Sequence, residues 1–273
     1  MKPAIVLLHS SMSSKAQWAA LAAHLGDSYR PVALDLLGYG TASFPAAASG
    51  AGYVHTLAHE IDAINAALDA ELAPDEPFHL VGHSYGGASA LHLARRMPHR
   101  LLSLVLHEPV AFHLLPPHDP SRVEITAVVD TILAAPSDRD ATRIFIDYWN
   151  RPGAFDAAPP AAQDKMIAMI AKVRLDFQAL LGEPVSFADL AALKVRTLVM
   201  AGQHSPISTR GLAPQLAAAL PNATVLETRG AHMGPITHGD AINPIIAAFI
   251  AGTWERDGVV TELDSRLRGN DEA

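Results

Sequence analysis

The stretch HLVGHSYGGASALHLARRM, residues 79–97, places a Gly-His-Ser-Tyr-Gly turn between an apolar run and an alanine-rich helical pattern that stops before Pro98. This strand, turn and helix order lifts the serine at the centre of the turn, Ser84, above the end of the strand. The tight turn requires small residues two positions before and after that serine, and Gly82 and Gly86 occupy those positions. We therefore predict that Ser84 is a nucleophile facing the positive end of the helix that follows it.

Short β-branched or leucine-rich runs recur on both sides of this stretch, and most are followed by a loop and a helical pattern. The runs are Ala4–Leu8, Pro31–Asp35, Phe78–Val81, Leu102–Leu106, Arg196–Met200 and Thr224–Glu227. Such an alternation is typical of a doubly wound α/β fold. We expect about six parallel strands flanked by helices.

The alternation lapses over residues 112–190, where prolines separate helical pieces such as Asp164–Leu181. We interpret this segment as a helical cap inserted into a core formed by residues 1–111 and 191–252. The last stretch, residues 253–273, mixes charged residues with glycines and has no sustained apolar period. It is predicted to be a flexible C-terminal tail.

The composition excludes several classes of function. The 273 residues carry a formal net charge of −8 without any cluster of basic residues longer than a pair, so a nucleic-acid partner is not expected. No cysteine is present, which excludes disulfides, thiolate catalysis and cysteine-bound metals. No apolar run is long enough to span a bilayer, and the first one is too short for a signal peptide. We expect a cytoplasmic protein with no membrane partner that binds a small-molecule substrate, and a homodimer remains possible.

A serine hydroxyl is a weak nucleophile unless a base takes its proton, so a histidine should lie near the same sheet edge. The chain has fourteen histidines, and most of them are expected to be solvated surface residues. His232 differs because it follows the last predicted strand and precedes the last predicted helix. This position predicts that His232 is the general base.

A carboxylate must orient the imidazole and stabilise its protonated form. Glu108 follows the apolar run Leu102–Leu106 after one intervening residue, His107, and its desolvation there would be costly unless it found a partner such as His232. Glu227 is the one carboxylate between Asp189 and His232, and it falls within or at the end of the final predicted strand. We choose Glu108 as the acid. One alternative is that Glu108 has a purely structural role and accepts hydrogen bonds from loop N–H groups. Asp147, in the predicted cap, is a more distant candidate for the acid.

Backbone N–H groups should hold the oxyanion that forms when a carbonyl is attacked. One of them is expected from Tyr85, which directly follows the nucleophile. The other is expected from Ser11, in the loop that follows the first predicted strand and leads into a helix containing Trp18.

Together these residues resemble the serine α/β-hydrolase family, over about residues 4–251, and GHSYGG is the most specific element of the likeness. The turn Asp35–Gly40 and the Gly-Ala-His-Met-Gly loop around His232 are further matches. The resemblance implies an α/β-hydrolase fold with a nucleophile elbow and a catalytic triad. Ser10 departs from the family pattern, which usually has glycine there, so the oxyanion donor in this loop could be Ser10 or Ser11.

A second departure concerns the acid, which in many members of the family follows the strand that corresponds to Arg196–Met200. The loop after that run reads Ala-Gly-Gln-His-Ser-Pro, with Ser205 in the place of the expected Asp. Some haloalkane dehalogenases carry their acid after the strand that corresponds to Leu102–Leu106, and Glu108 is similar to that arrangement.

The function that we predict is hydrolysis of a small, largely apolar carboxylic ester through an acyl-enzyme on Ser84, without metal or organic cofactor. C–C bond hydrolysis or perhydrolysis on the same triad is an alternative, and a non-catalytic receptor or scaffold is another. A dehalogenase or an epoxide hydrolase would need a carboxylate at position 84. The residues expected to contact the substrate are Phe112, Phe145, Trp149 and Met233.

Overall fold

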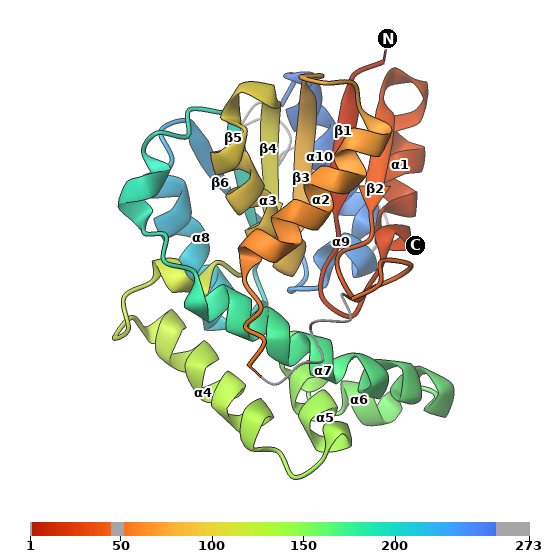
Figure 1. Ribbon diagram of the computed structural model, residues 1–273, viewed down its shortest axis with the longest axis vertical. Coiled ribbons are helices and arrows are strands. Elements are labelled where there is room, and N and C mark those ends of the chain that lie inside the picture. Colours follow the sequence, from red (N-terminus) through yellow and green to blue (C-terminus); the bar gives the residue numbers. More distant parts are fainter. Residues whose placement is uncertain (1, 45–51, 255–273) are drawn as a thin grey trace, which may run out of the picture.

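The computed structural model describes residues 2–44 and 52–254, so all but the first two positions of the predicted tail lie outside the described residues. Six strands form one sheet in the order β2-β1-β3-β4-β5-β6, and every neighbouring pair is parallel (Figure 1). The strands are β1 (Ala4–Leu8), β2 (Arg30–Leu34), β3 (Phe78–His83), β4 (Leu101–His107), β5 (Thr197–Gly202) and β6 (Ala223–Thr228). The predicted number and direction of the strands are confirmed.

The central strands β1, β3 and β5 are buried along their whole length because helices cover both faces of the sheet. Alternate residues of β1 divide between the faces: Ile5 and Leu7 pack with α1 (Ala19–Leu25) and α10 (Gly239–Ala251). The opposite face packs against α2 (Leu57–Glu71), α3 (Tyr85–Arg96) and α8 (Ile207–Ala219). The core therefore consists of two hydrophobic layers, one on each side of the sheet.

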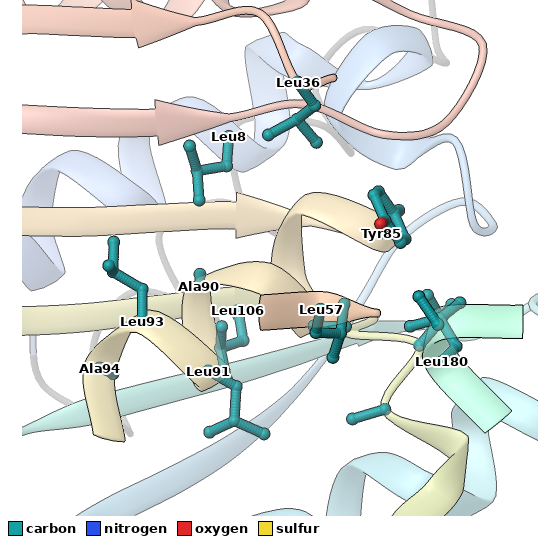
Figure 2. Packing of buried hydrophobic residues seen from close by; sticks show 14 of the residues in the cluster. Leu8, Leu36, Leu57, Tyr85, Ala90, Leu91, Leu93, Ala94, Leu106 and Leu180 are labelled. Atoms are coloured by element: carbon teal, nitrogen blue, oxygen red, sulfur yellow. The ribbon is translucent and has the colours of Figure 1, made fainter. Parts of the chain in front are cut away.

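Four helices occur between β4 and β5, and we call them the inserted helices. They are α4 (Pro120–Ala134), α5 (Asp138–Trp149), α6 (Ala154–Ala157) and α7 (Pro160–Gly182). They gather at one end of the sheet, beyond the carboxyl ends of the strands (Figure 1). Leu180 of α7 belongs to the same apolar cluster as Leu8 and Leu106 of the sheet (Figure 2). The division into core and cap stays a prediction.

The helix α8 begins at Ile207. Its first turn is stabilised by Glu124 of α4, whose carboxylate accepts a hydrogen bond from the Ser208 N–H at 2.6 Å. This cap comes from a distant segment and leaves no local signal. Among the helices of the described residues, none is long and apolar enough to cross a membrane.

Candidate active site

Ser84 lies in a strained turn between β3 and α3. Its backbone has φ 55° and ψ −119°, a region that residues with side chains rarely adopt. A Cβ on Gly82 would lie 2.4 Å from the carbonyl oxygen of Gly86, and a Cβ on Gly86 would lie 2.4 Å from the carbonyl oxygens of Leu8 and His9. Both positions therefore need glycine because backbone approaches too closely for any side chain.

His232 lies between Ser84 and Glu108 in a chain of hydrogen bonds. Its Nε2 is 2.9 Å from Ser84 Oγ, and its Nδ1 is 2.7 Å from Glu108 Oε2. Because a carboxylate can only accept, Nδ1 carries the proton and Nε2 is left to accept the serine hydroxyl. All three residues are buried to at least nine-tenths. The structure thus brings together the three residues that the sequence singled out.

Glu108 is held by partners beyond the histidine. Its Oε1 accepts hydrogen bonds from the Gly202 N–H at 2.6 Å and from the hydroxyl of Ser205. Burial opposes ionisation, but the hydrogen bond and charge of His232, with smaller contributions that include Ser205, hold the pKa of Glu108 well below its usual range. Ser205, which stands where the resemblance would place an acid in many family members, therefore stabilises the carboxylate of Glu108, the residue after β4.

The other carboxylates considered from the sequence lie elsewhere. Glu227 is on β6 and is exposed to solvent. Asp147 accepts hydrogen bonds from the backbone N–H groups of Gly153 and Phe155, both at 2.9 Å, so it orders a loop between α5 and α6. Neither geometry suits an acid that orients His232.

The two serines after β1 differ in what their backbone can donate. The N–H of Ser10 already donates to Oε1 of Gln17 at 3.1 Å, and the Ser10 hydroxyl donates to the same atom. Within the described residues, the N–H groups of Ser11 and Tyr85 make no hydrogen bond. Of the three predicted oxyanion donors, Ser11 and Tyr85 are therefore the two whose N–H groups have no acceptor among the described residues.

His83 connects the loops on the two sides of the site. Its Nε2 donates to the carbonyl oxygen of His232 at 2.8 Å, and its Nδ1 lies 3.1 Å from the side-chain amide of Gln17. Burial keeps the pKa of His83 well below its usual value, so the ring remains neutral and this pattern of donor and acceptor persists. Gln17 in turn binds Ser10, so the loop that carries His232 and the loop after β1 are joined.

A cavity of about 280 Å³ opens directly beside Ser84. Its lining contains no charged side chain and includes Phe145, Trp149 and Met233, three of the four residues expected to contact a substrate. The Trp149 ring lies 4.0 Å from the His232 ring, at 31° to it. Phe112 lies apart from this cavity and is fully buried in the core.

Several cavity residues carried no signal in the sequence. Ile146 comes from α5, Asn150 directly follows that helix, Ala154 begins α6, and Ile236 comes from α9 (Gly234–Thr237). They belong to no recognisable motif, and they line the cavity because the inserted helices and α9 lie over the sheet edge. In the described ranges, no group of three or more histidine, aspartate or glutamate side chains could hold a metal ion.

Comparison with known proteins agrees with this geometry. The model of the alpha/beta hydrolase fold family matches residues 3–131. Lipase LipV of Mycobacterium tuberculosis is 37% identical over 140 residues, which cover 50% of this chain and 47% of LipV, so the match spans about half of that relative. A haloalkane dehalogenase of Mesorhizobium japonicum is 25% identical over 91% of this chain and 84% of its own length.

Solved structures show the same architecture. The enol-lactonase from Burkholderia xenovorans superimposes with a TM-score of 0.72 at 19% identity, over 92% of both chains. At this level of identity the likeness concerns the fold. The family match, the six parallel strands and the elbow at Ser84 lead to one conclusion. This chain has the α/β-hydrolase fold, and its residues 3–131 match the model of that family.

Proposed function

We propose that this protein is a serine hydrolase that cleaves a small, largely apolar carboxylic ester. The observation that carries the proposal is the hydrogen-bonded chain from Glu108 through His232 to Ser84, with the serine lining a cavity that has no charged side chain. The match to the family model and a lipase relative support hydrolysis of an ester.

In the first half-reaction, Ser84 Oγ attacks the ester carbonyl carbon while His232 Nε2 takes the hydroxyl proton. The N–H groups of Ser11 and Tyr85 hold the oxygen that becomes negative. His232 then returns the proton to the leaving alcohol, and the acyl group stays on Ser84. In the second half-reaction His232 takes a proton from water, whose oxygen attacks the acyl carbon. His232 then returns this proton to Ser84 Oγ as the C–Oγ bond breaks, which releases the carboxylic acid and restores the serine.

Glu108 stabilises the imidazolium that exists between these proton transfers. Its pKa lies far below neutrality, so it accepts the Nδ1 proton as a hydrogen bond and remains ionised throughout. A haloalkane dehalogenase is among the relatives, but a nucleophile in that reaction must form an ester that water can cleave. A serine ether formed from an alkyl halide is not such an ester, which favours acyl transfer.

The size of the cavity favours small acyl groups, because about 280 Å³ is at the lower end of the range of sites that bind drug-sized ligands. We therefore expect the highest kcat/KM on p-nitrophenyl acetate or butyrate and a fall towards the octanoate.

The test combines turnover with covalent labelling. A fluorophosphonate should label the wild-type protein at Ser84, located by peptide mass spectrometry, and Ser84→Ala should lose both label and turnover. Ser43→Ala, at an exposed serine, is the matched control and should keep both. A wild-type protein that neither reacts with the probe nor cleaves any ester would favour a receptor or scaffold. Cleavage of a diketone substrate would indicate C–C bond hydrolysis on the same triad. Formation of a peracid from an ester in hydrogen peroxide would indicate perhydrolysis.

A further inference from the structure

Two carboxylates and one ammonium group lie buried together where α7 contacts the core. Lys172 and Asp176 are one turn apart on α7, and Glu60 belongs to α2. Lys172 Nζ forms an ion pair with Asp176 and lies 3.6 Å from Glu60 Oε2. None of the three side chains is more than 7% exposed. Buried ion pairs are weak evidence for stability, because desolvation offsets much of their attraction, so their position invites a functional explanation.

Asp176 connects three segments of the chain. Its Oδ2 accepts a hydrogen bond from the Ser11 hydroxyl at 2.6 Å and another from the Tyr39 hydroxyl at 2.5 Å, and its Oδ1 accepts from Lys172. Ser11 belongs to the loop after β1, and Tyr39 belongs to the turn after β2. One carboxylate of an inserted helix therefore holds both loops.

The loop that carries Ser11 needs such support. The next residue, Met12, has φ +56°, a strained conformation for a residue with a side chain. Strain of this kind persists only when surrounding contacts enforce it. Ser10 is fixed through Gln17, whereas the side chain of Ser11 is fixed through Asp176. The direction of the free Ser11 N–H therefore depends on the hydrogen bond between its own hydroxyl and Asp176.

The same cluster also contacts the second oxyanion donor. Lys172 Nζ lies 4.7 Å from the centre of the Tyr85 ring, and the Tyr85 hydroxyl donates to Glu60 Oε2 at 3.1 Å. The stem of Lys172 packs closely over Gly38, where an added Cβ would lie 3.3 Å from it. Both residues that offer a free N–H are therefore anchored through their side chains to charged groups of one cluster.

We propose that Asp176 is a positioning residue that aligns the oxyanion-binding N–H of Ser11, so that the seating of α7 on the core decides whether the site is competent. This proposal rests on the proposed hydrolase function. The negative charge on the carbonyl oxygen appears only in the transition state, and a misaligned donor weakens that state more than it weakens substrate binding. Loss of Asp176 should therefore lower kcat with little change in KM.

The experiment compares Asp176→Asn, Ser11→Ala and the double variant with the wild-type protein. Asparagine keeps the volume but cannot accept from Ser11, Tyr39 and Lys172 as the carboxylate does. We expect kcat on p-nitrophenyl butyrate to fall about 10- to 100-fold in each single variant, since a misplacement of about 1 Å can cost that much. The double variant should be no slower than the slower single variant, because both changes break one linkage. Amide hydrogen exchange of a peptide spanning residues 9–14 should be faster in Asp176→Asn.

Asp164→Asn, an exposed aspartate on the same helix, is the matched control and should match the wild-type protein in every measurement. A merely structural role would lower the melting temperature without separating kcat from KM, and additive losses in the double variant would overturn the proposal. So would unchanged loop exchange in Asp176→Asn. If Asp176→Asn does not fold, Ser11→Ala serves as the test, because it keeps the charges of Lys172, Asp176 and Glu60. Unchanged kcat and unchanged loop exchange in Ser11→Ala would then overturn the proposal. A wild-type protein inert towards esters would refute the proposed function, and the exchange measurement would then still show whether Asp176 holds the loop.

Discussion

Replacing Glu108 by glutamine tests the part of the site that departs most from the family pattern. The side chain keeps its volume but loses its charge, and one of its two acceptor positions becomes an NH2 group. Oε1 faces the Gly202 N–H, which can only donate, and Oε2 faces His232 Nδ1. An NH2 group towards Gly202 would leave two donors facing each other. An NH2 group towards His232 would push the ring proton onto Nε2, where it blocks proton transfer from Ser84.

The size of the effect follows from the lost charge. With charge centres about 4 Å apart and an effective dielectric constant of about 20, the attraction between carboxylate and imidazolium is about 4 kcal/mol. Each 1.36 kcal/mol corresponds to about tenfold in rate, so kcat should fall about 10³-fold. KM should change little, because the imidazolium forms only after the substrate is bound.

The assay is steady-state hydrolysis of p-nitrophenyl butyrate, with the rate of fluorophosphonate labelling as a second measure of serine reactivity. Glu227→Gln is the matched control, since Glu227 is an exposed carboxylate on the edge strand β6 and should be dispensable. Circular dichroism must show that both variants are folded. Turnover of Glu108→Gln within tenfold of the wild-type rate would refute the assignment of Glu108 as the acid, and an equal loss in Glu227→Gln would point to a nonspecific effect.

Three further outcomes are expected. The free energy of unfolding should fall as pH drops from about 6.5 to about 4, because burial lowers the pKa of His107 to about 4 and the unfolded chain therefore binds a proton first. His107→Leu should reduce the dependence of the unfolding free energy on pH, measured by chemical denaturation. An unchanged pH dependence would contradict this. Gly86→Ala should abolish activity and lower the melting temperature, because its Cβ would lie 2.4 Å from two backbone oxygens; a melting temperature equal to that of the wild-type protein would show that the turn can relax. Trp149→Ala should shift the preference towards longer acyl chains, read as the octanoate to butyrate ratio of kcat/KM, and an unchanged ratio would place the acyl group elsewhere.

The sequence predicted those parts of the site that depend on local chain order. Ser84, Glu108 and His232 each directly follow a strand or its turn at one sheet edge, so the parallel arrangement brings them together. The strand runs could be read because burial on both faces makes them mainly β-branched or leucine-rich. Phe112 was expected at the substrate but lies in the core, because an aromatic residue next to a strand end is equally suited to either place.

The supporting contacts could not be predicted, because they join segments far apart in the chain. Ser11 and Asp176 are separated by 165 positions, and Ser205 and Glu108 by 97. In the sequence, Ser205 indicated only that the usual carboxylate was missing from this loop. In the structure, the hydroxyl of Ser205 donates a hydrogen bond to Glu108. Such roles depend on how the inserted helices and the loops pack, and no short pattern in the sequence encodes that packing.

The strained residues explain why so many contacts converge on this edge of the sheet. In the described part of the chain, the residues other than glycine with positive φ are Met12, Ser84, Glu108 and Asp75, and the first three follow β1, β3 and β4. Each such conformation costs about 1–3 kcal/mol and persists because its neighbours enforce it. At Ser84 the conformation is enforced by neighbouring glycines and by backbone hydrogen bonds. At Glu108 it is enforced by hydrogen bonds from the Gly202 N–H and Ser205. At Met12 it is enforced by the hydrogen bond between Asp176 and the adjacent Ser11. Strain and support are thus located together, so a substitution that relieves one of these conformations should gain stability at the expense of turnover.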